Sequence, residues 1–116
     1  MLPKGENTTE LLTIANDEQL YDKLVQQLNK DLLYANIDEN FAVNISPEKL
    51  KRGLHEIIYR LINEKFAEYL NLLYIIDVPE KQVKALDGSD VLEMSEQVAF
   101  LILRREWQKV WFKNRL

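Results

Sequence analysis

Cysteine is absent from this 116-residue sequence, and histidine occurs once, as His55. The lack of cysteine excludes disulfide frameworks, cysteine zinc sites, thiol catalysis and iron–sulfur clusters. The helical metal motifs also fail, because Tyr59 stands where HExxH needs its second histidine and Arg52 stands where Glu-x-x-His needs a glutamate. The sequence therefore predicts no metal and no cofactor, and we expect His55 to be a partly exposed helical residue with no role beyond surface chemistry.

Glycine and proline are also scarce, at three residues each. Few tight turns and long regular elements follow from this scarcity, which favours helices over a strand-rich barrel or sandwich. The three glycines, Gly5, Gly53 and Gly88, are too far apart to form a P-loop or a dinucleotide-binding fingerprint. The sequence thus gives no support to nucleotide binding.

Long apolar runs are missing as well. The two longest, residues 72–76 and 98–103, are far shorter than the roughly 20 residues of a membrane-spanning helix. The N-terminal stretch, MLPKGENTTELLTIAN, has neither the basic start nor the apolar run of a secretory signal peptide. We therefore expect a cytoplasmic protein without a transmembrane segment.

Apolar periodicity and helix-start signals predict an all-α fold, an antiparallel bundle of three long helices. The long helices are expected at 17–35, 47–76 and 90–113, with a short helix at 79–86 and an extended connector at 36–46. Residues 1–15 are expected to form a flexible or loosely packed arm, and residues 16–116 a single helical domain.

Three short motifs set the expected helix starts. Asn16 with Gln19, and Asp90 with Glu93, have the spacing of a capping box, in which the first side chain accepts backbone N–H bonds. Ser46 precedes Pro47, whose fixed φ and missing N–H suit the first helical position. These motifs predict helix starts near residues 17, 47 and 90.

Two segments have more apolar surface than three helices can cover. Residues 98–103, VAFLIL, are apolar on every face of a helix, and residues 70–76 are apolar on most faces. Burying such surface requires neighbouring helices or another chain. The leading hypothesis is therefore a non-enzymatic protein-interaction or assembly module, a homo-oligomer such as a homodimer, in an unknown pathway.

The C-terminal segment, residues 104–115, concentrates aromatic and basic side chains. Residues 1–103 carry ten basic and eighteen acidic side chains, whereas residues 104–116 carry five basic and one acidic, and both tryptophans of the chain lie in this end. Tryptophan and arginine are favoured anchors of protein interfaces. The candidate partner interface comprises Arg104, Arg105, Trp107, Lys109, Trp111, Phe112, Lys113 and Arg115.

Three interpretations of the C-terminal segment remain open. The tryptophans can close the core while cations complement the negative end of the helix dipole. The segment can instead dock on a helical partner or a second copy of the chain. It can also bind an anionic surface, nucleic acid or acidic membrane, although the negative charge of the other residues opposes this. An enzyme without a recognisable motif is a further alternative, and no catalytic residue is assigned.

The segments 32–54 and 72–86 resemble each other. Each has a Leu-Leu-Tyr helix end followed by Pro-Glu-Lys and a later leucine. A duplicated helix–loop–helix unit explains the likeness, but so does the repeated use of the same helix-end and helix-start chemistry, which we favour.

Overall fold

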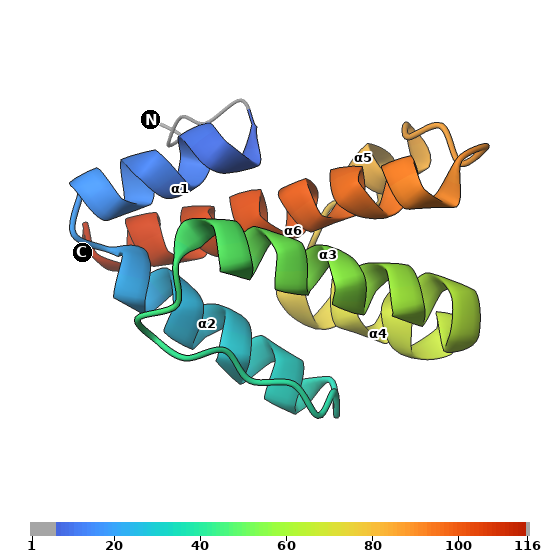
Figure 1. Cartoon of the computed structure of the whole chain (residues 1–116), viewed down its shortest axis with the longest axis horizontal. Coiled ribbons are helices and arrows are strands. Elements are labelled where there is room, and N and C mark those ends of the chain that lie inside the picture. The colour runs from blue at the N-terminus through green and yellow to red at the C-terminus, as the bar shows by residue number, and fades with distance from the viewer. Residues whose placement is uncertain (1–6, 116) are drawn as a thin grey trace.

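The computed structural model describes residues 7–115 and confirms an all-α fold, with no strand in that range (Figure 1). Its described residues form more helices than the sequence predicts, and their lengths differ. The helices are α1 (Thr8–Asp17), α2 (Tyr21–Tyr34), α3 (Pro47–Glu64), α4 (Phe66–Ile76), α5 (Glu80–Lys84) and α6 (Val91–Lys113).

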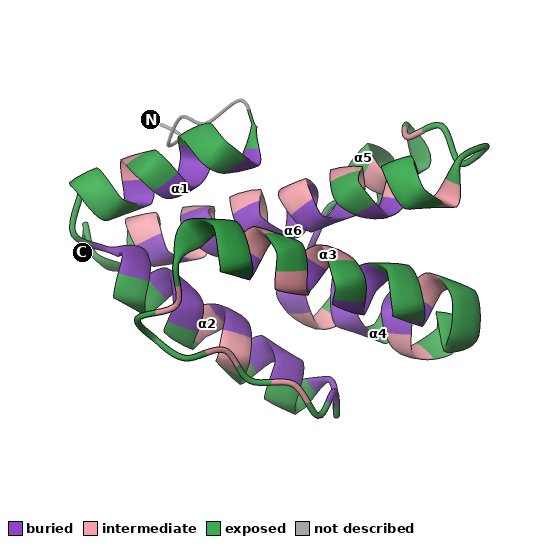
Figure 2. Ribbon diagram, viewed as in Figure 1, coloured by how far each residue is buried: buried purple, intermediate pink, exposed green. Residues whose placement is uncertain are grey.

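Helix α6 organises the core. It is 23 residues long and contacts each of the other five helices. Its central residues Val98, Ile102 and Leu103 are fully buried, and Figure 2 shows the buried sides of the surrounding helices turned towards it. A single chain therefore covers nearly all of the 98–103 segment, so this segment does not require the second copy that the sequence suggested.

The N-terminal arm is not loose where the structure describes it. Thr8–Asp17 is a regular helix whose start is capped by Asn7, because the Asn7 side chain accepts a hydrogen bond from the backbone N–H of Glu10 at 2.8 Å. Leu11, Leu12 and Ala15 are buried in the core. Residues 8–15 of the expected arm are thus helical and pack on the core, and its first six residues lie outside the described range.

The predicted helix start at residue 17 is also wrong. Asn16 and Asp17 end α1, and the chain turns at Gln19, which has a φ of 61°. Helix α2 then begins at Tyr21 without any side-chain cap. The Asn16–Gln19 spacing fits a capping box, but the buried leucines upstream decided that this segment closes one helix before the next begins.

The predicted helix 47–76 is two helices joined at Lys65. Lys65 leaves the helical region, with φ −143° and ψ 62°, and α4 runs back antiparallel beside α3 (Figure 1). A continuous helix of thirty residues would be about 45 Å long, whereas the longest dimension of the protein is 36 Å. Doubling back buries Tyr69, Leu72 and Ile76 of α4 in the common core.

The connector between α2 and α3 is non-helical, as predicted, and is fastened at its middle. The Asn29 amide of α2 donates to the carbonyl of Phe41 and accepts from its N–H, both at 2.8 Å. The Phe41 ring lies against Gly53 of α3, so close that a Cβ there would stand 2.7 Å from the ring. A glycine is therefore needed at position 53 for this packing.

The remaining helix starts agree with the sequence. The Ser46 side chain accepts from the N–H of Lys49, and the Asp90 side chain accepts from the N–H groups of Leu92 and Glu93. Helix α5 has five residues and is shorter than the predicted helix 79–86. The helix at the equivalent place in the other similar segment, α3, has eighteen residues. The likeness between 32–54 and 72–86 thus does not extend to equal helices. None of the helices formed by residues 7–115 has the length and apolar composition to cross a membrane.

Candidate interaction surfaces

Aromatic residues of the C-terminal segment are divided between core and surface. Trp107 is 1% exposed and belongs to the core, so it is not open to a partner. Trp111 is half-buried, whereas Phe112 is 42% exposed and its ring packs edge-on against that of Trp111 at 5.0 Å. Of the candidate interface, Phe112 is therefore the aromatic side chain with most surface available.

The arginines of the C-terminal segment bind other parts of the same chain. Arg105 donates to the backbone carbonyl of Asp77 and forms an ion pair with the Asp77 carboxylate at 3.1 Å. Arg104 donates to the Gln82 side chain at 3.0 Å. Arg115 pairs with Glu18 at 2.6 Å and stacks over the ring of Trp111. These contacts fasten the end of α6 to the turns around it and occupy the cations expected to meet an anion.

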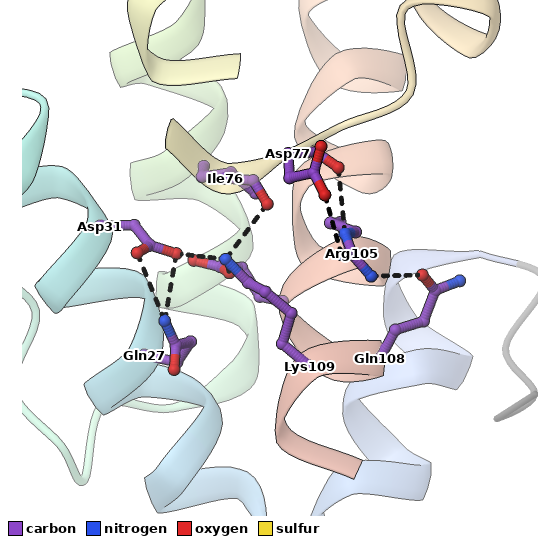
Figure 3. Close-up of polar contacts among 8 residues, drawn as sticks. Gln27, Asp31, Ile76, Asp77, Arg105, Gln108 and Lys109 are labelled. Atoms are coloured by element: carbon purple, nitrogen blue, oxygen red, sulfur yellow. Dashed lines mark hydrogen bonds and ion pairs between the residues drawn. The ribbon is translucent and has the colours of Figure 1, made fainter. Parts of the chain in front are cut away.

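Lys109 lies in a partly buried polar cluster between α2, α4 and α6 (Figure 3). Its ammonium group is 2.7 Å from the Asp31 carboxylate, 3.1 Å from the carbonyl of Ile76 and 2.8 Å from Glu106. Gln27 also donates to Asp31, at 3.3 Å. Asp31 is 4% exposed and Glu106 is fully buried. The sequence alone did not predict this cluster, because 75 positions of sequence separate Asp31 from Glu106.

The pKa values of the two carboxyl groups of the cluster are shifted in opposite directions. Burial, with help from the adjacent Asp31 carboxylate, raises the pKa of Glu106 to about 9, although Lys109 acts against the shift. Burial would also raise the pKa of Asp31, but the contacts from Glu106, Lys109 and Gln27 outweigh it and hold this pKa below the ordinary value. Near pH 7 the cluster thus contains one carboxylate, one ammonium and one neutral acid, with no net charge.

His55 makes a specific contact rather than remaining a free surface residue. Its Nε2 atom is 2.8 Å from the Ser95 hydroxyl and 3.1 Å from the carbonyl of Leu92, and that hydroxyl itself donates to Leu92 at 2.8 Å. Nε2 therefore acts as the donor and joins α3 to the start of α6. Ser95 is fully buried and its proton is committed, so this serine–histidine pair does not present a nucleophile to a substrate.

Helix α4 carries an exposed apolar row. Phe66, Leu70 and Tyr74, spaced four residues apart, are 53%, 50% and 82% exposed and follow one line along the helix. Ala67 and Asn71 are exposed on the adjoining line. We call these five residues the α4 face. The sequence drew attention to 70–76 as apolar, but it did not show which side stays uncovered.

Comparison with known proteins yields little similarity. No family model matches the chain, and no solved structure matches it. Among curated proteins, it is similar to General transcription factor II-I repeat domain-containing protein 1 of Mus musculus, with 30% identity over 73 residues. These residues are 63% of this chain and 6% of that protein, so the chain spans a small fraction of the relative's length. The likeness is confined to that short region and does not show a family.

Proposed function

We propose that this protein is a non-enzymatic assembly module that associates with a second copy of itself through the α4 face. The observation that carries the proposal is that the face has no charged side chain, although 29% of all residues in the chain are charged. Exposed helix faces are ordinarily polar and charged. An uncharged row of two aromatics and a leucine favours contact with another apolar surface.

A second copy suits this face better than an unrelated partner because the surface is compatible with itself. In a two-fold interface the same patch meets its own copy, so every charge near the axis would face a like charge. The α4 face avoids this repulsion. With the axis at Leu70, antiparallel α4 helices would place Phe66 of each copy against Tyr74 of the other, and the row at Ala67 and Asn71 leaves a groove for these ridges.

The size of the face predicts a weak association. The exposed parts of Phe66, Leu70 and Tyr74 amount to roughly 350 Å² per copy, taking full aromatic side chains as about 150–250 Å². Stable interfaces bury about 800 Å² per partner. We therefore expect a dimer with a dissociation constant in the micromolar range or weaker.

The C-terminal arginines support an anion-binding adaptor less well, because each already has a partner within the chain. We also propose a cytoplasmic location, because a chain without cysteine needs no oxidising compartment to form disulfides.

The test uses opposite charges at the two-fold axis. Sedimentation equilibrium up to a protein concentration of several hundred micromolar should show a dimer for the parent chain and a monomer for Leu70→Lys and for Leu70→Glu. Mixing these two variants should restore the dimer, because Lys and Glu then meet across the axis. Leu92→Lys, at a leucine 55% exposed on α6, is the matched control and should still dimerise. A monomeric parent, or a control as monomeric as Leu70→Lys, would exclude the proposal.

A further inference from the structure

A hollow between α2 and the end of α6 gathers positive charge, and no acidic side chain of residues 7–115 lines it. It has a volume of about 400 Å³, and seven residues line it: Lys23, Gln26, Gln27, Lys30, Val110, Lys113 and Asn114. The α2 residues follow one another at spacings of three, one and three, and the α6 residues at three and one, so each helix turns a single face to the hollow. We call it the lysine hollow.

Each lysine of the hollow is exposed, and among residues 7–115 none of the three forms an ion pair. Lys23 donates to the Asn114 side chain at 2.7 Å, which draws the two helices together across the hollow. No acidic side chain lines it. Helix α2 has two acidic residues, Asp22 and Asp31, and neither lines the hollow. Asp31 is buried and already bound by Lys109. The positive potential of the hollow is therefore not cancelled from within.

Helix stability does not account for this arrangement. A lysine in the last turn of a helix complements the negative end of the dipole, which explains Lys113 alone. Lys23 lies in the first turn of α2, where a cation is unfavourable, and Lys30 lies outside its last turn. The dipole therefore does not explain Lys23 or Lys30, although Lys30 lies 5.8 Å from the ring centroid of Tyr34.

We propose that the lysine hollow binds a small ligand that carries phosphate groups. Lysine ammonium groups bind phosphate as point charges, and the side-chain amide of Gln26 can donate to one of its remaining oxygens. The amides of Gln27 and Asn114 already donate to Asp31 and to the carbonyl of Val110. Val110 is the one apolar side chain of the lining, whereas pockets for apolar ligands are lined mainly by hydrophobic residues. The volume is at the lower end of the range for ligand pockets, which suits a pyrophosphate or a phosphorylated headgroup.

The first experiment is a titration of the ¹⁵N-labelled protein with inorganic pyrophosphate at constant ionic strength, followed by amide chemical shifts. Saturable shifts confined to residues 23–30 and 110–114 are expected. The affinity of the triple variant Lys23→Gln/Lys30→Gln/Lys113→Gln for pyrophosphate should be lower by a factor of at least about ten. The control Lys49→Gln/Lys65→Gln/Lys81→Gln changes the net charge equally at exposed lysines elsewhere and should bind within about twofold of the parent.

Two outcomes would overturn the proposal: shifts that do not saturate, or equal weakening in both triple variants, which indicates attraction by net charge alone. All six substitutions are at exposed side chains, and circular dichroism checks that both variants fold. Flotation with phosphatidic acid vesicles then distinguishes the source of the phosphate. Pyrophosphate binding without flotation identifies a soluble ligand, whereas flotation lost only in the hollow variant identifies a lipid headgroup.

Discussion

The end of α6 and the α4 face both carry aromatic side chains, but they differ in what surrounds those side chains. Around the end of α6, arginines and a lysine reach neighbouring turns, and Trp107 fills the core. The α4 face has no charged side chain and no intramolecular cover over Tyr74, which is 82% exposed. At the end of α6, charged residues beside the aromatic side chains thus anchor them within the chain. The uncharged α4 face has no such contacts and remains available to a partner.

The largest expected effect comes from removing the core aromatic of α6. Trp107→Ala should lower the free energy of unfolding by about 3–5 kcal/mol, because it empties a fully buried site. Tyr74→Ala on the α4 face should lower it by less than about 1 kcal/mol. Urea denaturation of both variants makes the measurement, and equal losses would show that the two aromatic groups are not distinguished as described.

A smaller loss is expected when the buried cluster loses its cation. Lys109→Met keeps most of the side-chain stem but leaves the Asp31 carboxylate buried without its ion pair, which should cost about 3 kcal/mol. Lys113→Met, at an exposed lysine one turn away, should change stability by about 0.5 kcal/mol or less.

Adding Asp31→Asn to Lys109→Met removes the unpaired charge and should restore part of the stability. If the double variant is as unstable as the sum of both single variants, the two side chains do not act as a pair. Chemical denaturation of the four proteins supplies this comparison.

The third effect is a dependence on pH that the α4 face does not share. The folded protein keeps a proton on Glu106, whose pKa is about 9, whereas the unfolded chain releases it above its ordinary value of 4.5. Stability from this group is complete below pH 4.5 and is lost as pH rises towards 9. Between pH 6 and pH 8 the loss should be about 2–3 kcal/mol.

Urea midpoints at pH 6, 7 and 8 should fall in this order for the parent, and Glu106→Gln should flatten the series because the amide does not titrate. The lowered pKa of Asp31 acts in the other direction and only in acid, where its contribution is lost as pH falls. A parent series that is flat or rises with pH would show that Glu106 is ionised in the folded protein.

Local signals in the sequence were reliable where a side chain and its own backbone decide the structure. Ser46 with Pro47, and Asp90, mark helix starts correctly because capping involves residues only two or three positions apart. The same logic failed at Asn16, and it gave no warning of the break at Lys65. In both places the burial of distant leucines and aromatics, and not local hydrogen bonding, chose where the chain turns.

By itself the sequence determined helical structure, the absence of thiol chemistry and the crowding of aromatic and basic residues at the end of the chain, because these follow from residue types and their periodicity. Only the tertiary structure decided which of those residues are open to a partner. Lys109 meets Asp31 across 78 positions of sequence, and Lys23 meets Asn114 across 91. Such contacts depend on how helices pack, so the free lysines and the uncovered α4 face become visible only in the folded chain.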